Sequence, residues 1–319
     1  MASLSWRRIL RVSVSLLSVV AIIVLVIAGL SRTVVGQSRA PFASPPPGSP
    51  PAKIRPYSEF GGCPEEPAQF HRCAQEKAKT FNPPRTADGK PDFQGYWNRI
   101  GIRNLENIEE HPESIDGSGD RSSVVDPADG RIPYQPWAAA KREAHFEKYL
   151  DAGQFCLPDG APRFGYGATK FVVQTPGYVF MLNDYADTYR IVPMDGRPHL
   201  RPDIKLWQGS VRGRWEGNTL VIDVANQLAE TTMDHIGNFF SQNAHVVERI
   251  TMIDKDVIYY TATIEDAKVF TRPWTMAWGW RRNPNPKYEM WEQGCWEGVQ
   301  SALKYTDEGR KRSRGAFQK

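Results

Sequence analysis

The sequence predicts a mainly β fold, an antiparallel lipocalin-like barrel or curved sheet, with one N-terminal transmembrane helix and one amphipathic helix. From Cys156 onward, short apolar runs alternate with turn residues about every 8 to 12 positions, which is typical of an antiparallel meander. Residues 12–30 form one uncharged apolar stretch, and residues 137–150 carry the alanines, lysines and glutamates of a helix. A long meander closes readily into a barrel, because closure removes strand edges that would otherwise recruit other chains.

The uncharged stretch is close to the about 20 residues that a helix needs to cross a bilayer. A cleavable signal peptide usually has a shorter apolar core, followed by an A-x-A cleavage site. Because no clean site of this kind follows Leu30, we expect residues 1–31 to be a cytoplasmic stub and an uncleaved signal anchor. Arg7, Arg8 and Arg11 precede the helix and Arg32 follows it. The excess of arginines before the helix predicts a single-pass protein of the inner membrane, with its N-terminus in the cytoplasm and its body in the periplasm.

Composition divides the rest of the chain into four segments. Residues 32–57 are rich in proline and serine, which predicts an extended spacer. Residues 58–155 are loop-rich and contain one helix, whose first turn suits Pro136. Residues 156–300 form the β-barrel domain, and residues 301–319 form a basic tail. The net charge is only +4 and the basic excess lies at the two chain ends, so nucleic acid is not expected as a partner.

The strands follow from the apolar runs and from the turns between them. Pro176 followed by Gly177 matches a type II turn, which needs a positive φ at its third residue. The other hairpins turn at short polar segments of the same kind. The expected strands span residues 170–174, 178–182, 188–192, 209–215, 219–225, 245–253, 257–264, 274–280 and 288–296.

The four cysteines predict two disulfides, because an even number in an oxidising compartment is usually paired. Three pairings are possible, and we favour Cys63 with Cys73 and Cys156 with Cys295. The chain has no CxxC pairs of the kind that bind zinc, and no CxxCH motif for a c-type haem. We expect neither a metal nor a cofactor.

Three tryptophans share one face of an expected strand, because Trp274, Trp278 and Trp280 alternate with smaller residues. In the simplest interpretation these side chains fill the barrel interior. They could also line a small-molecule pocket, or face outward as a contact for a protein or a membrane. Pro273 lacks an amide proton and therefore places the start of this strand at an edge or a bulge.

Motifs with a known catalytic mechanism are absent from the sequence, which has no GxSxG, HExxH, P-loop or EF-hand pattern. The weak catalytic candidates are His199, His245 and Glu248, which could converge at one barrel mouth as a metal site or an acid–base pair. His235, Asp195 and Asp234 could join them there. Histidines held by local hydrogen bonds are the simpler interpretation.

Glu248 has the same strand parity as Val246 and Ile250 and would therefore point into an apolar interior. A carboxylate at such a position needs a partner, which Arg190 or Arg214 could supply. A buried ion pair of this kind is first a structural feature and only secondarily a sign of catalysis.

Several motifs together resemble a family of uncharacterised exported proteins that is abundant in soil bacteria. They include "PRTADGKPDFQGYWN", "RGRWEGNTLVID" and "IEDAKVFTRPW", within a region of about residues 80–297. The last two motifs are also similar to hairpins of lipocalin-like domains. The resemblance implies a β-barrel and an exported location, and it implies no catalytic residue. The anchor, the spacer and the segment from Cys63 to Cys73 depart from the family.

The leading functional hypothesis is a non-catalytic, membrane-anchored accessory subunit that stabilises a larger membrane protein complex. Its partners would be other subunits of that complex, and membrane lipid would contact the N-terminal helix. A photosynthetic or respiratory complex is favoured, because such assemblies often acquire external subunits.

The alternative hypothesis is a periplasmic lipocalin-like binder or enzyme that acts on a small apolar or aromatic molecule. In that case Trp274, Trp278 and Trp280 line the pocket. The polar groups would come from His199, His245 and Glu248. A third possibility is a scaffold of the cell envelope that binds anionic lipid through the basic tail.

Overall fold

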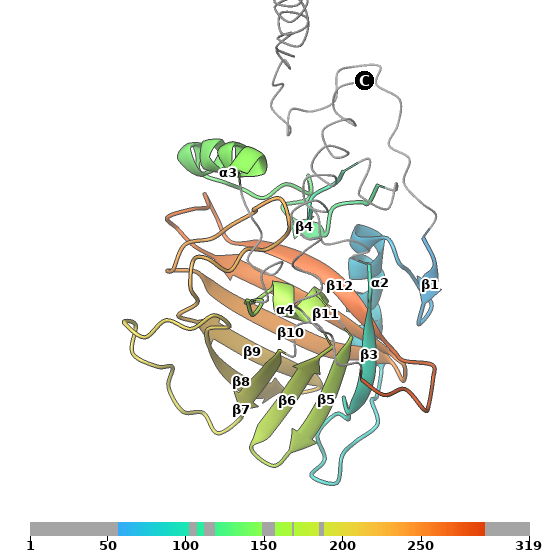
Figure 1. Ribbon diagram of the computed structural model, residues 1–319. Helices are drawn as coiled ribbons and strands as arrows, with labels where there is room; N and C mark the ends of the chain where they lie inside the picture. Colours follow the sequence, from blue (N-terminus) through green and yellow to red (C-terminus); the bar gives the residue numbers. More distant parts are fainter. Residues whose placement is uncertain are drawn as a thin grey trace, which may run out of the picture. The chain divides into compact units, whose positions relative to one another are not determined.

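The computed structural model describes residues 57–101, 107–111, 119–148, 157–167, 169–184 and 188–290. Its main feature is one antiparallel sheet with the strand order β7-β6-β5-β3-β12-β11-β10-β9-β8, in which β4 also pairs with β12. The sheet curls so that it forms a nearly closed barrel (Figure 1). The fold is therefore mainly β, as the sequence predicts. The strands are β3 (Gly95–Ile100), β4 (Val124–Asp126), β5 (Lys170–Thr175), β6 (Tyr178–Asn183), β7 (Tyr189–Pro193), β8 (Ser210–Glu216), β9 (Thr219–Ala225), β10 (His245–Asp254), β11 (Val257–Glu265) and β12 (Trp274–Arg282).

The predicted hairpins are confirmed, and their strands end within a few residues of the expected positions. β5 and β6 are joined at Pro176 and Gly177, and Gly177 has a φ of 85°, as a type II turn requires. β8 with β9, and β10 with β11, are antiparallel pairs joined by the expected polar turns. The expected strand at 288–296 is described only for its first three residues, 288–290, which are not in a strand; its remainder lies outside the described residues.

The sheet also takes in two strands that sequence analysis placed in a loop-rich segment. β3 lies between β5 and β12, pairing Tyr96 with Phe171 and Trp280 with Arg99. β4 pairs with β12 where the register shifts between Thr275 and Met276. The sheet therefore begins before residue 156, and β12 starts beside an irregularity, directly after Pro273.

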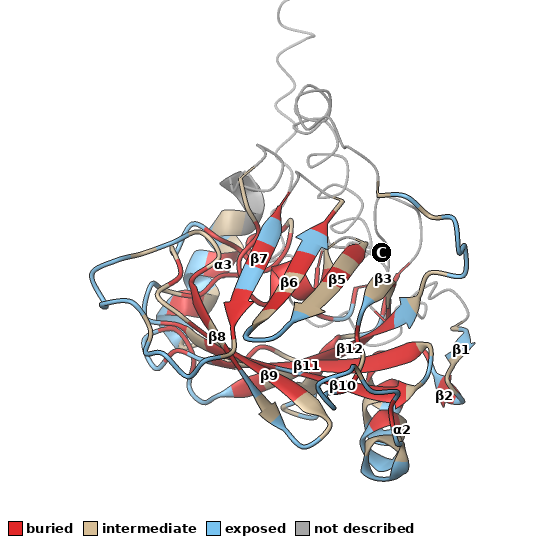
Figure 2. Ribbon diagram, turned by 90° about the horizontal axis from the view of Figure 1, so that it is seen from below, coloured by how far each residue is buried: buried red, intermediate tan, exposed pale blue. Residues whose placement is uncertain are grey.

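A helix that sequence analysis missed, α2 (Pro67–Thr80), lies on the outer surface of the sheet. The Glu66 side chain caps it by accepting hydrogen bonds from the backbone N–H groups of Ala68 and Gln69, at 3.3 and 2.9 Å. Phe70 and Ala74 are its buried residues at the sheet, where they pack with Tyr259. Figure 2 shows α2 beside the buried strands β10 and β12.

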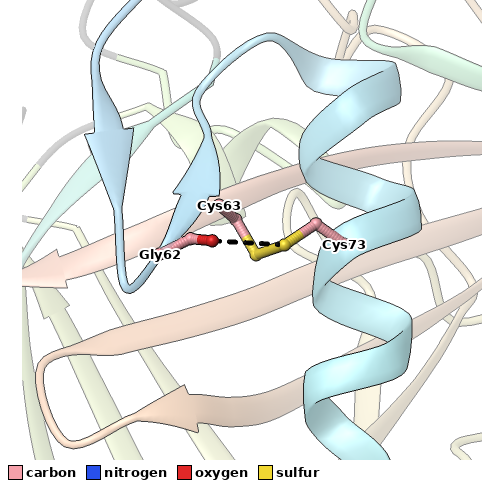
Figure 3. The surroundings of a disulfide bond; sticks show 3 residues. All are labelled: Gly62, Cys63 and Cys73. Atoms are coloured by element: carbon pink, nitrogen blue, oxygen red, sulfur yellow. Dashed lines mark hydrogen bonds between the residues drawn. A yellow bond between two sulfur atoms is a disulfide. The ribbon is translucent and has the colours of Figure 1, made fainter.

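A short hairpin of β1 (Glu59–Phe60) and β2 (Cys63–Pro64) precedes α2 and is joined to it by a disulfide. The bond between Cys63 and Cys73 confirms the favoured pairing (Figure 3). The other expected pair, Cys156 with Cys295, lies outside the described residues. The amphipathic helix is confirmed as α3 (Pro136–Lys148), which begins at Pro136.

The expected membrane anchor lies outside the described residues, as do the basic tail and nearly all of the spacer. In the part of the chain that the structure describes, no helix combines the length and apolarity needed to cross a bilayer.

The barrel is closed between its two end strands, β7 and β8, by side chains rather than by a backbone ladder. Val192 and Met194 contact the position of Gly213 on β8 so closely that a β-carbon there would collide with both. We call this contact between β7 and β8 the seam. Since no strand pairing holds it, the seam can widen without breaking ladder hydrogen bonds.

Candidate functional site

The tryptophan face of β12 points into the barrel and fixes a short helix, α4 (Arg163–Tyr166). The carbonyl oxygen of Gly165 accepts hydrogen bonds from the indole nitrogens of Trp278 and Trp280, at 3.2 and 2.7 Å. Tyr260 stacks on Trp278 with a centroid distance of 4.2 Å. Trp274 is also buried, but it packs against the Phe270 ring instead. All three tryptophan side chains are therefore buried inside the protein. Only Trp278 and Trp280 contact the same group, the carbonyl oxygen of Gly165.

Beside these rings lies a buried charged cluster, which we define as Arg190, Glu248 and Lys170. The Nη1 atom of Arg190 lies 2.6 Å from Oε2 of Glu248, and both side chains are at most 1% exposed. Arg190 is thus the partner that Glu248 needs. The other predicted partner, Arg214, pairs with Glu216 on the surface.

Aromatic rings enclose the charged cluster on the α4 side. The guanidinium carbon of Arg190 lies 4.2 Å from the centroid of the Phe164 ring. The Nζ atom of Lys170 lies 5.8 Å from the same centroid and 5.5 Å from that of Trp280. Cations over aromatic faces are attracted by the ring quadrupole, most strongly when water is excluded. The two cations of the cluster therefore contact aromatic rings of α4 and β12.

Burial changes the acid–base properties of this cluster. Burial, together with the neighbouring charge of Arg99, lowers the pKa of Lys170 to about 7. Burial also raises the pKa of Glu248, against the opposing charge of Arg190. The pKa of Tyr260 is raised for the same reason. Near neutral pH, Lys170 is therefore partly deprotonated, whereas an exposed lysine is almost fully protonated.

Part of the hydrogen-bonding capacity in the charged cluster is unused. Arg190 donates from Nη1, while its Nε and Nη2 atoms are buried and have no hydrogen-bond acceptor. The Tyr260 hydroxyl lies close enough to Arg190 and Glu248 to interact with both and to change their electrostatics. Buried donors without acceptors are rare in folded proteins, and here Glu248 and Tyr260 are the polar groups closest to Arg190.

The structure brings His199 and His245 together, but it does not bring Glu248 to them. His199 and His245 both place Nε2 against Oδ1 of Asp223, at 2.7 and 2.9 Å. Glu248 lies three residues after His245, on the opposite face of β10, because side chains of a strand alternate between faces. The histidines are therefore outside the barrel, and Glu248 is inside it.

The other two acidic candidates also lie elsewhere. Asp195 pairs with the exposed Arg197, and Asp234 accepts hydrogen bonds from the backbone of Ile108 and from Asn238. Among the residues that the structure describes, no group of three or more metal-ligating side chains has the geometry of a metal site.

The pair of histidines shares one partly exposed carboxylate. The hydrogen bond with Asp223 raises the pKa of His245, and the same hydrogen bond lowers the pKa of Asp223, assisted by His199. The Nδ1 atom of His199 lies 3.2 Å from the Ser210 hydroxyl. This arrangement links the segment around His199 to β8, β9 and β10.

A second candidate site is an apolar surface on β5, β6 and β7 that sequence analysis did not identify. The register sets Phe171, Leu182 and Tyr189 in one row across the three strands, and Val173, Phe180 and Ile191 in a second row. We call these six side chains the outer apolar face. Tyr189 is 63% exposed, Ile191 44% and Leu182 36%. Figure 2 shows exposed stretches on β6 and β7. The signal in the sequence is that both parities of these strands carry large apolar residues.

Comparisons of the chain with models of protein families, with curated proteins and with solved structures give no match. The resemblance drawn from the sequence motifs therefore stays a prediction.

Proposed function

We propose that the protein is a non-catalytic, membrane-anchored extracytoplasmic accessory subunit that stabilises a larger membrane protein complex. The observation that carries this proposal is the outer apolar face, with Tyr189, Ile191 and Leu182 exposed side by side. Contiguous apolar surface on a folded protein marks a site of interaction. The partners are other subunits of the complex, and a photosynthetic or respiratory assembly is the class that we favour.

The position of the face supports docking. β7 is the last strand in the sheet order, and its outward side chains Tyr189 and Ile191 stand at the edge of the barrel. Aromatic residues are enriched at interfaces, where a large ring buries much surface at a small cost in entropy. A partner that covers β7 would also cover the seam.

The scattered catalytic candidates fit the same role. Within the described residues, His199 and His245 form a structural pair with Asp223, and Glu248 is held by Arg190. Each of these groups is explained by local hydrogen bonds and ion pairs. None of them needs a reaction to account for its position.

The proposal is tested by purifying the full chain from its native membrane in mild detergent and identifying co-migrating chains by mass spectrometry. Double substitution of Tyr189→Asp and Ile191→Asp should abolish co-migration and leave the melting temperature within a few degrees of the wild type. The matched control is Leu200→Asp with Ile204→Asp, because these side chains are similarly exposed but lie outside the face. A wild-type chain that purifies alone, or a control that behaves like the test variant, would contradict the proposal.

The alternative, a lipocalin-like binder of small molecules, is favoured by one observation. The charged cluster of Arg190, Glu248 and Lys170 is buried inside the barrel, where Arg190 packs beside the Phe164 ring. A binding function of the interior is compatible with docking through the exterior.

A further inference from the structure

We infer that a cavity at one end of the barrel binds a small aromatic carboxylic acid. The cavity has a volume of about 580 Å³, and ligand pockets usually have about 300–1,000 Å³. It lies where the segment before β3 and the turn between β5 and β6 reach the same end of the barrel (Figure 1). We call it the end cavity. The inference does not depend on the docking proposal, because no side chain of the outer apolar face lines this cavity.

The floor of the end cavity is apolar and spans the seam. It consists of Val179 on β6, Met194 directly after β7, and Trp215 on β8. Gly213 leaves room for Met194, because a β-carbon at Gly213 would collide with the Met194 sulfur. The backbone N–H of Met194 donates to the carbonyl oxygen of Gly177 at 2.9 Å. Met194 is therefore held between the turn after β5 and strand β8.

The Trp215 ring favours an aromatic ligand. Its centroid lies 5.6 Å from that of the Phe93 ring, and the two ring planes are inclined by only 6°. Trp215 lines the end cavity and Phe93 does not, so the side of the indole away from Phe93 is the side that a ligand can reach. A flat ring placed there continues the stack, which is a preferred arrangement of aromatic rings. The Met194 thioether adds a sulfur that also contacts aromatic rings favourably.

Side chains fill the barrel next to this floor, which limits the length of the ligand. Phe93 is 1% exposed, and its carbonyl oxygen accepts a hydrogen bond from Nε1 of the buried Trp97 at 2.7 Å. Val179 is 2% exposed. The end cavity therefore does not continue into the core as the channel that a long alkyl chain would need. A molecule of one or two rings suits this short space better than a fatty acid does.

The rim of the end cavity favours a negative charge on the ligand. Its ionisable side chains are Asp88, Lys90 and Arg214. Arg214 pairs with Glu216 at 2.8 Å, and Asp88 accepts a hydrogen bond from the Thr86 hydroxyl. Among the described residues, no carboxylate forms an ion pair with Lys90. A ligand carboxylate would pair with this ammonium group while its ring lies on Trp215.

Hydrogen bonds hold the segment that carries Lys90 against the sheet before any ligand binds. The Gln174 side chain accepts from the backbone N–H of Phe93 at 2.6 Å and donates to the carbonyl oxygen of Pro91 at 3.0 Å. The turn itself is closed by the backbone N–H of Thr86, which donates to the carbonyl oxygen of Lys90 at 2.8 Å. Binding therefore orders little additional backbone, which lowers its cost in entropy.

The test is calorimetric titration of the full chain in detergent, against a detergent blank, with three compounds. Sodium 2-naphthoate has the ring and the charge, 2-naphthamide has the ring alone, and sodium octanoate has the charge alone. The wild type should bind 2-naphthoate about fivefold more tightly than the amide, which is the most that an exposed ion pair usually contributes. It should bind octanoate more weakly than 2-naphthoate.

Two variants separate the contributions of charge and ring. Lys90→Met should abolish the preference for the acid over the amide, whereas Lys268→Met, at an equally exposed lysine that does not line the cavity, should keep it. Trp215→Leu should weaken the binding of both naphthalene compounds about tenfold. Its control is Trp137→Leu, because Trp137 is 53% exposed and does not line the cavity.

The inference is overturned if the wild type binds neither naphthalene compound at millimolar concentration, or if it binds the amide or octanoate as tightly as 2-naphthoate. It is also overturned if Lys90→Met keeps the wild-type preference, or if a folded Trp215→Leu keeps the wild-type affinity. Should Trp215→Leu unfold, Lys90→Met decides alone, since Lys90 is exposed and its loss leaves the core intact. Failure of the docking experiment would leave each of these outcomes unchanged.

Discussion

The carbonyl oxygen of Gly165 lies 2.7 Å from the indole nitrogen of Trp280 and accepts its hydrogen bond inside the barrel. This contact joins α4 to the central strand β12, and Trp278 strengthens it with a second hydrogen bond. The tryptophans thus satisfy a backbone carbonyl that would otherwise be buried without a partner.

Gly165→Ala should destabilise the fold by about 1–3 kcal/mol, because overpacking of a dense core has this cost. A β-carbon at this position would lie 2.7 Å from Trp278 and 2.9 Å from Tyr260. Gly167→Ala is the matched control, since its nearest contacts are 3.3 and 3.4 Å. Urea unfolding measures both variants, and equal losses would show that the rings around Gly165 can move aside.

Glu248→Leu alone should destabilise the protein by about 3–5 kcal/mol, because it leaves the buried charge of Arg190 without its carboxylate. The double variant with Arg190→Met should lose less, since it removes both charges. Arg214→Met, which breaks an exposed pair with Glu216, should change stability by about 0–1 kcal/mol. A double variant less stable than Glu248→Leu would refute this account of the cluster.

Because of the titration of Lys170, the free energy of unfolding should increase as the pH rises from about 7 towards 10. Its pKa is about 7 in the folded state and about 10.5 in the unfolded chain, so over this range the unfolded chain binds more protons. Below pH 7 both states are protonated, and the full cost of burying the charge is present. Lys170→Met should therefore stabilise the protein more at pH 6 than at pH 9.5. Denaturant unfolding at the two pH values measures this difference, and a gain that is independent of pH would contradict it.

Asp223→Asn should lower the pKa of His245, because the hydrogen bond from Asp223 is the main cause of its raised pKa. The stability that His245 contributes is complete below the unfolded pKa of about 6.5, and it is lost as the pH rises through the folded value. An NMR titration of the imidazole protons checks the shift. Glu265→Gln should have a smaller effect, since Glu265 lies 3.9 Å from Nδ1. A larger effect of Glu265→Gln would show that Glu265, and not Asp223, is the main cause of the raised pKa of His245.

The hairpins were predictable because their strands carry regular apolar runs, and their turns contain residues such as Gly177 that adopt a positive φ. β3 was missed because its fully buried side chains, Trp97 and Ile100, are three residues apart and do not alternate. Helix α2 was missed for a related reason. It buries few apolar residues against the sheet, and its cap is Glu66 rather than a serine or threonine.

Strand parity predicted which side of the sheet a candidate side chain occupies, but it was applied only to some of the candidates. Parity placed Glu248 inside the barrel and led to Arg190 or Arg214 as its partner, and Arg190 is the one observed. The same rule puts His245 on the other face of β10, which excludes a common cluster with Glu248. Lys170 had no such signal, since it stands at the start of its strand, where a lysine usually faces solvent.

The place of β3 between β5 and β12 has a consequence for the order in which the protein assembles. During synthesis, β3 leaves the ribosome well before β5 and long before β12, so neither of its hydrogen-bonding edges has a partner when it emerges. The two hairpin groups on either side can form from local contacts, but they join only through this early strand. Closure therefore waits for the last strand, and contacts of such long sequence separation slow the folding of β proteins.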